Sequence, residues 1–168
     1  WVVLGVDVPE GDQPLWATQT TNTRTGADTW RCKECHGWDY RGAEGAYGSG
    51  SHFTGFPGIF ESRTKSFDDL LAAMRGGTNP DHDFSALMAE QDLVDMVTFM
   101  SQALIDPDTL LADDNTSTGN ADSGGELFGQ VCTHCHGPNG NAINFESIEE
   151  PEFLAHLATD NPWEFIHK

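Results

Sequence analysis

The strongest hydrophobic periodicity in the chain lies between residues 89 and 104, where Leu, Met and Val side chains recur every three or four positions. This spacing predicts an amphipathic helix with one apolar face turned toward a core. A shorter helix is expected over 66–75, because Ser66 is a suitable N-cap, aspartates occupy the first turn, and a Gly-Gly pair follows. No segment has the pattern of a strand, so the chain is predicted to be mainly α.

The remaining segments are less regular. Residues 1–24 combine prolines, glycine and a polar run, which predicts an irregular arm, with Trp1 and Trp16 lying against the body of the protein. Short helices are expected over 126–131, 151–157 and 161–167, the last with Asn161 as N-cap and Pro162 at its first position.

Composition places a domain boundary near the middle of the chain. Asp, Asn, Thr, Ser and Gly dominate the stretch after Pro107, which is typical of a linker. The length of 168 residues suits one ordinary domain or two small ones. We therefore predict four parts: an irregular arm at 1–24, a first domain at 25–105, an acidic linker at 106–124 and a second domain at 125–168.

Two five-residue motifs use all four cysteines of the chain. They are Cys32-Lys33-Glu34-Cys35-His36 and Cys132-Thr133-His134-Cys135-His136. C-x-x-C-H is the pattern for covalent attachment of a c-type haem. Thiols at this spacing can reach the two vinyl groups of one porphyrin, and the histidine that follows can bind the iron. The sequence therefore predicts two covalently bound haem c groups, held by Cys32 and Cys35 and by Cys132 and Cys135, with His36 and His136 as iron ligands.

Other uses of the four cysteines fit less well. A four-cysteine zinc site usually has about 15–20 residues between its two pairs, whereas the gap here is several times longer. A thioredoxin-like redox pair needs a βαβ setting, which neither motif has. Two structural disulfides would leave the histidine that follows each pair without an explanation.

These residues resemble tandem class I c-type cytochrome domains, in which a helix, C-x-x-C-H, a short helix, a ligand loop and a last helix follow one another. Residues 26–105 run through that order once, with Phe99 at the aromatic position of the last helix. Gly125 and Phe128 match the family's positions before the second motif. The stretches TWRCKECHGWDYRG, HDFS and NPWEFIHK are similar to dihaem cytochromes of respiratory and extracellular electron transfer. The resemblance implies two small haem domains with long irregular loops.

The chain departs from the family in its sixth iron ligand and in its second domain. The usual ligand is a methionine before a proline, and no methionine here precedes a proline. His82 occupies the corresponding loop and is the favoured sixth ligand of the first haem, with Met88 and His52 as alternatives. The second domain reaches residue 168 before its expected ligand loop and last helix, so we expect it to be incomplete.

The second haem has several possible sixth ligands. His156 and His167 both fall on predicted short helices and could face the iron. A ligand from beyond residue 168 or from another chain is an equal alternative. His134 lies inside the attachment motif and is expected to point to solvent.

The formal net charge of −19 arises from 27 acidic and 8 basic residues. Nucleic acid is therefore an unsuitable partner, whereas redox proteins with basic surfaces would be attracted. Mean hydropathy is −0.44, and no apolar stretch approaches the roughly 20 residues of a transmembrane helix. Because haem c is attached outside the bacterial cytoplasm, and the start of the chain lacks the pattern of a signal peptide, we expect a mature periplasmic or extracellular protein.

Electron transfer is the function that two six-coordinate haems would favour, because such an iron has no open position for a substrate. The protein is therefore not expected to be an enzyme. Its second haem is expected to lie at a contact with the first domain or with another copy of the chain. A contact between copies would give a homo-oligomer, or a filament with haems in series. The alternative is a dihaem enzyme of the peroxidase or thiosulfate-oxidising type, which would need an open haem site.

Overall fold

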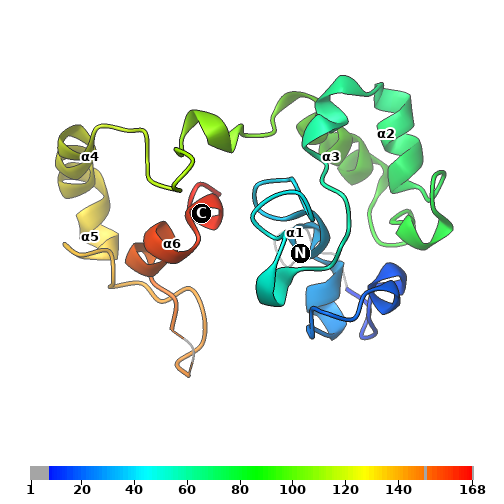
Figure 1. Ribbon diagram of the computed structural model, residues 1–168, viewed down its shortest axis with the longest axis horizontal. Coiled ribbons are helices and arrows are strands. Elements are labelled where there is room, and N and C mark those ends of the chain that lie inside the picture. The colour runs from blue at the N-terminus through cyan, green and yellow to red at the C-terminus, as the bar shows by residue number, and fades with distance from the viewer. Residues whose placement is uncertain (1–7, 150, 168) are drawn as a thin grey trace. The chain divides into compact units, whose positions relative to one another are not determined.

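A computed structural model describes residues 8–149 and 151–167 of the chain (Figure 1). It divides the chain into two compact units, Trp1–Ile105 and Asp106–Lys168. The described residues are mainly helical, and their extended segments form nothing longer than isolated β-bridges. The prediction of a mainly α protein is therefore confirmed. Within the same residues, no helix combines the length and apolar character needed to cross a membrane.

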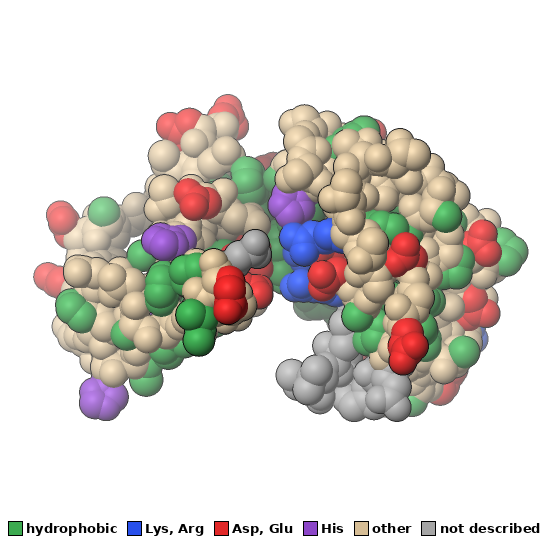
Figure 2. Space-filling model, turned by 90° about the horizontal axis from the view of Figure 1, so that it is seen from below, with side chains coloured by type: hydrophobic (Ala, Val, Ile, Leu, Met, Phe, Trp, Pro, Cys, Tyr) green, Lys and Arg blue, Asp and Glu red, His purple; other side chains and the backbone are tan. Residues whose placement is uncertain are grey.

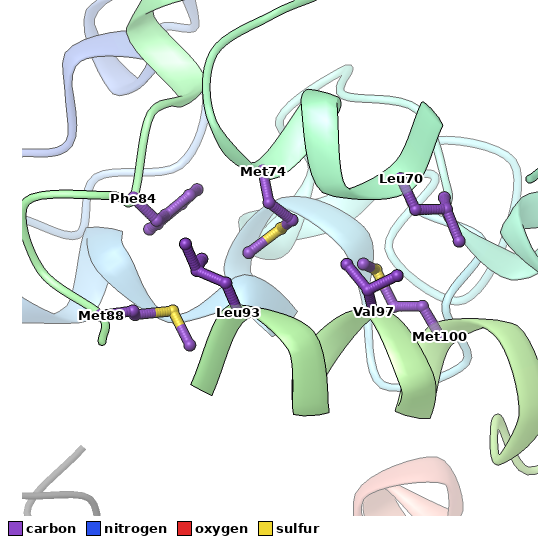
Figure 3. Close-up of a cluster of buried hydrophobic side chains, with 7 residues drawn as sticks. All are labelled: Leu70, Met74, Phe84, Met88, Leu93, Val97 and Met100. Carbon is purple, nitrogen blue, oxygen red and sulfur yellow. The ribbon is translucent and has the colours of Figure 1, made fainter. Parts of the chain in front are cut away.

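The core of the first unit lies where helices α2 (Phe67–Met74) and α3 (Glu90–Gln102) pack together. Figure 3 shows their side chains meeting those of the loop between them. Each large apolar side chain buried in this way contributes about 1.5–3 kcal/mol through its removal from water. The buried members of this cluster are Leu70, Met74, Phe84, Met88, Leu93, Val97 and Met100.

Both helices begin where their sequence signals predict. The Ser66 hydroxyl accepts a hydrogen bond of 3.2 Å from the Asp69 amide, which caps the first turn of α2. Helix α3 starts after its N-cap Ala89 and ends at Gln102, two residues before the predicted end. Boundaries of this kind are the least certain part of a sequence pattern, because the last turn of a helix often frays.

The N-terminal arm is an integral part of the first unit. Its described part contains the short 3₁₀ helix η2 (Pro14–Thr18), on which Trp16 is buried and donates a hydrogen bond of 2.8 Å to the Arg24 carbonyl. The backbone amide of Gln13 donates to the Thr29 hydroxyl at 2.8 Å. The expected position of Trp16 is therefore confirmed, whereas Trp1 lies outside the described residues.

The described part of the second unit contains the 3₁₀ helix η7 (Pro107–Thr109), four short α-helices and a π-helical turn. The α-helices and the turn are α4 (Ala121–Leu127), the π turn η8 (Phe128–Cys132), α5 (Thr133–His136), α6 (Leu154–Asp160) and α7 (Pro162–Phe165).

Two predicted helix starts in this unit are wrong. Helix α4 starts five residues before the predicted 126, because the Asn120 side chain accepts a hydrogen bond from the Ser123 amide and caps it inside the expected linker. Helix α6 starts at Leu154 and not at 151. Asn161 caps α7 as expected, accepting from the Glu164 amide at 3.3 Å.

The second unit has little apolar core. Among the described residues of this unit, the large aliphatic side chain that becomes buried belongs to Leu157, which is 2% exposed. By contrast, Leu127 and Val131 are 61% and 65% exposed. They lie four positions apart, which places them on one face of the helical segment that leads into the second motif.

Candidate functional site

The first C-x-x-C-H motif forms helix α1 (Cys32–His36), a single turn that follows the 3₁₀ helix η3 (Gly26–Trp30). Gly37 ends it with a φ of 73°, a left-handed conformation that glycine adopts without strain. The Gly37 amide donates to the Lys33 carbonyl at 2.9 Å, and the Gly42 amide donates to the His36 carbonyl at 2.8 Å. These bonds close the turn that follows His36.

The orientation of the His36 ring is fixed by a backbone carbonyl. Its Nδ1 lies 2.8 Å from the carbonyl oxygen of Pro57. A carbonyl can only accept, so Nδ1 carries the proton and the lone pair of the neutral ring lies on Nε2. This tautomer is the one that a metal-binding histidine adopts when a second group holds its other nitrogen.

Close backbone contact brings Pro57 to this position. Gly42 and Pro57 form an isolated antiparallel bridge. A Cβ atom on Gly42 would lie 2.5 Å from the Phe56 carbonyl oxygen, and one on Gly58 would lie 2.5 Å from the Tyr40 carbonyl oxygen. Glycine is therefore required on both sides of the contact that supports the His36 ring.

His82 lies opposite His36. It ends the 3₁₀ helix η6 (Pro80–His82), and its Nδ1 lies 3.2 Å from the Ala73 carbonyl oxygen. The centroids of the His36 and His82 rings are 6.2 Å apart, and the ring planes meet at 76°. Both rings therefore use Nδ1 for a backbone carbonyl and keep Nε2 for another partner.

This spacing fits one metal ion bound between the two rings. A metal–imidazole bond is about 2.0–2.1 Å long, and with the radius of each ring two such bonds would separate the centroids by about 6 Å. Among the described residues, no group of three or more His, Cys, Asp or Glu side chains is arranged to hold a metal by itself. An axial pair such as His36 and His82 has the donor set that haem iron takes from a protein.

Burial sets the protonation of the motif. It raises the pKa of the Cys35 thiol to about 12, and the nearby Cys32 and Glu34 act in the same direction. Burial also lowers the pKa of the His36 imidazole. At neutral pH the Cys35 thiol therefore keeps its proton and the His36 ring is uncharged, which is the form that binds a metal.

A buried carboxylate inside the first motif is a feature that sequence reasoning missed. Glu34 is 0% exposed, and its oxygens lie 2.7 Å from Lys33 Nζ and 3.2 Å from Arg24 Nε. A buried charge is tolerated only when it is paired in this way. The pair with Arg24 joins the N-terminal arm to α1. A carboxylate next to lysine in the sequence gives no signal of such burial.

The two alternative ligands of the first site have other contacts. The His52 ring stacks on Tyr47, with centroids 4.6 Å apart and an angle of 22° between the planes. Met88 is 5% exposed and belongs to the core cluster beside Phe84 and Leu93. His82 is therefore the candidate that the structure brings next to His36.

The turn that follows the second motif repeats the one that follows the first, although Cys132 ends the π turn η8 whereas Cys32 begins α1. Helix α5 ends at Gly137, whose φ and ψ are 74° and 166°, against 73° and 162° at Gly37. The Ala142 amide donates to the His136 carbonyl at 3.0 Å, as Gly42 does to His36. Tyr40 and Gly140 also share a left-handed φ, at 62° and 68°. Two C-x-x-C-H motifs followed by turns of the same conformation thus lie one hundred residues apart in the chain.

His136 has a different environment from His36. Its ring lies near Phe145, with centroids 6.1 Å apart, and its buried Nδ1 has no hydrogen-bond partner among the described residues. His156 is exposed and contacts Phe153, with ring centroids 5.5 Å apart. The Nδ1 of His167 lies 2.6 Å from the Trp163 carbonyl oxygen.

The candidate ligands of the second site thus have contacts of their own: the rings of His136 and His156 lie near Phe145 and Phe153, and His167 is bonded within its own helical segment. His134 is exposed, as expected for a residue on the outside of the attachment turn.

Comparison with known proteins adds no relative. The chain matches no family model, no curated protein and no solved structure. Functional inference therefore depends on the chemistry and geometry of the residues described above.

Proposed function

We propose that this protein is a dihaem c-type cytochrome that transfers electrons and catalyses no reaction of its own. The observation that carries the proposal is the pairing of His36 with His82, whose rings are 6.2 Å apart with each Nδ1 next to a backbone carbonyl. The two C-x-x-C-H motifs, with their matching turns at Gly37 and Gly137, supply its covalent part.

In the first cytochrome c-like domain, Cys32 and Cys35 would hold the haem, and His36 and His82 would be its axial ligands. The haem supplies an iron that cycles between the ferric and ferrous states. With both His36 and His82 bound to the iron, no position would remain for a substrate. This supports electron transfer over the alternative of a dihaem enzyme of the peroxidase or thiosulfate-oxidising type at this site.

In the second domain, Cys132, Cys135 and His136 would hold the other haem. Its sixth ligand remains open between His156, His167 and a residue from beyond residue 168 or from another chain. The orphaned Nδ1 of His136 shows that this domain lacks the counterpart of the Pro57 carbonyl among the described residues. We therefore propose that a rearrangement of this domain, or a contact with further protein, supplies both an acceptor for the His136 Nδ1 and the sixth ligand.

The partners that fit this molecule are redox proteins with basic surfaces. The second unit contains 12 of the 27 acidic residues, and its only Lys or Arg is Lys168. On the face shown in Figure 2, acidic side chains are spread widely, whereas the Lys and Arg side chains in view gather in one place. Such a charge distribution steers cationic partners by long-range attraction. Nucleic acid is disfavoured for the same reason.

An exposed apolar face on the second unit supports association of copies through this unit. Leu127 and Val131, both more than half exposed, lie directly before Cys132. A head-to-tail contact of this face would give a homo-oligomer or a filament with haems in series. The negative charge opposes such contacts unless salt screens it. Sedimentation at low and high salt tests this: association that grows with salt supports it, and a monomer at both contradicts it.

Covalent attachment of haem c takes place outside the bacterial cytoplasm, so we propose a periplasmic or extracellular location. The decisive experiment for the function is intact mass spectrometry of the protein produced with a haem-attachment system, together with a redox titration. A mass excess of two haems and reversible absorbance changes are expected. An excess of one haem, or of zinc, contradicts the proposal.

A further inference from the structure

One buried glutamine joins the segments that carry the two axial histidines of the first site. Gln13 is 3% exposed. Its backbone amide donates to the hydroxyl of Thr29 at 2.8 Å, close before Cys32. Its side-chain Nε2 donates to the carbonyl oxygen of Asp81 at 2.7 Å, immediately before His82.

Both ends of the Gln13 amide are used. Its Oε1 accepts a hydrogen bond of 2.6 Å from the Leu15 amide, which fixes the side chain at the start of η2. The amide plane is therefore held by its own segment while Nε2 reaches across to η6. The bond to the Asp81 carbonyl is partly buried, so its loss costs a hydrogen bond that water replaces only if the loop moves, and the contact favours one position of the loop.

The other anchors of the loop that carries His82 come from neighbouring segments: the Phe84 amide donates to the Met74 carbonyl at 3.0 Å, and Arg75 and Asp83 form an isolated bridge. The His82 amide donates to the Asn79 carbonyl at 2.9 Å, a bond inside the loop itself. The ring Nδ1 lies 3.2 Å from the Ala73 carbonyl oxygen, at the long end of the hydrogen-bond range. The shorter bond from Gln13 comes from a segment distant in sequence, so it limits how far the loop can move away from His36.

We propose that Gln13 is a positioning residue that keeps His82 on the iron of the first haem. The inference depends on the proposed function, because it assigns a role within the same site. Opening of the loop would detach the His82 ring and leave the sixth position free. Loss of the Gln13 bond should make that opening more frequent without removing the haem.

Carbon monoxide measures the opening directly, because it binds ferrous haem only when the sixth ligand has left. Two variants of the holoprotein separate donor loss from added charge. Gln13→Glu keeps an acceptor for the Leu15 amide and loses the donor to Asp81, whereas Gln13→Met loses both polar functions without adding charge. We expect carbon monoxide to bind the first haem about five- to tenfold faster in both, the factor that one hydrogen bond of ordinary strength provides.

Gln19 supplies a matched control in the same arm. Its Nε2 donates to the Asn22 carbonyl at 2.8 Å and its Oε1 accepts from the Thr21 and Asn22 amides, so these bonds stay within the arm. Gln19→Glu and Gln19→Met should leave the rate within about twofold of the wild type. Equal acceleration by the two pairs of variants would show general loosening of the arm and overturn the inference.

The two proposals fail in distinguishable ways. Carbon monoxide binding to the two haems is expected to give two kinetic phases. The phase that is accelerated in His82→Ala is assigned to the first haem. If the wild type holds no haem, or if His82→Ala keeps the low-spin spectrum at both haems, the proposed function is contradicted and this inference falls with it. If the wild type is low-spin and the Gln13 variants bind carbon monoxide at its rate, only the positioning role is contradicted.

Discussion

The imidazole rings of His36 and His82 lie with centroids 6.2 Å apart and planes at 76°, and each ring has its Nδ1 next to a main-chain carbonyl oxygen. The two histidines come from different elements, α1 and η6, whose positions depend on packing in the first unit. Because the carbonyl contacts place the proton of each neutral ring on Nδ1, the lone pair of Nε2 stays available to bind a metal.

The first prediction concerns the sixth ligand of the first haem. His82→Ala should convert one of two haems from low spin to high spin, because the iron loses an axial nitrogen, and its potential should rise, since histidine stabilises ferric iron. Absorption spectroscopy and a redox titration measure both effects. Met88→Ala is the control and should leave both haems low-spin, because Met88 lies in the core cluster. A high-spin haem in Met88→Ala, with none in His82→Ala, would assign the ligand to the methionine.

The second prediction concerns the glycine opposite Pro57. Gly42→Ala should displace the 56–58 segment, because the new Cβ would lie 2.5 Å from the Phe56 carbonyl oxygen. The left-handed φ of 53° adds a cost of about 1–2 kcal/mol. As the bond from His36 Nδ1 to Pro57 weakens, the ring becomes a poorer donor and the potential of the first haem should rise.

A redox titration of that haem checks this effect. Gly11→Ala is the control, because nothing lies within 4 Å of its Cβ position. An unchanged potential in Gly42→Ala would show that the Pro57 carbonyl does not tune the ring.

The third prediction concerns the buried ion cluster. Glu34→Gln keeps the size of the side chain and leaves Lys33 without its carboxylate, which should lower the free energy of unfolding by about 1–3 kcal/mol. We place the cost below that of a fully buried pair because the Arg24 side chain is 37% exposed and screened by water.

Denaturant titration of the holoprotein measures the change, and Glu44→Gln, at an exposed site, should alter the same quantity by less than about 0.5 kcal/mol. Equal effects of the two substitutions would mean that burial of Glu34 adds nothing to stability.

The fourth prediction compares two leucines in different units. Leu93 is 1% exposed in the core of the first unit, whereas Leu127 is 61% exposed. Leu93→Ala should lower the free energy of unfolding of the first unit by about 2–5 kcal/mol, through lost burial and the cavity left behind. Leu127→Ala should change the unfolding of the monomer by less than about 0.5 kcal/mol. A large loss in Leu127→Ala at concentrations where the protein is associated would instead locate Leu127 in the contact between copies.

Local features of the fold follow from the sequence. The capping pattern at Ser66 and the apolar spacing over 89–104 predicted α2 and α3, because side chains three or four positions apart share a face of a helix whatever surrounds it. The start of α4 was predicted too late, because no apolar repeat marks its first turn and Asn120 alone begins it. The close contact of Gly42 with Pro57 was not predicted, since it joins two loop segments that no periodicity relates.

The sequence by itself supplied the residues of both candidate sites. The spacing of Cys32, Cys35 and His36 is set by the covalent order of the chain, and each motif ends in a helical turn followed by a glycine of positive φ. Only the tertiary structure decided which histidine lies opposite His36. The sequence favoured His82 and kept Met88 and His52 as alternatives, and the position of His82 depends on the packing of α2 and α3, on the Ala73 carbonyl and on the bond from Gln13. These are contacts between segments far apart in the chain, whose distances local sequence patterns do not encode.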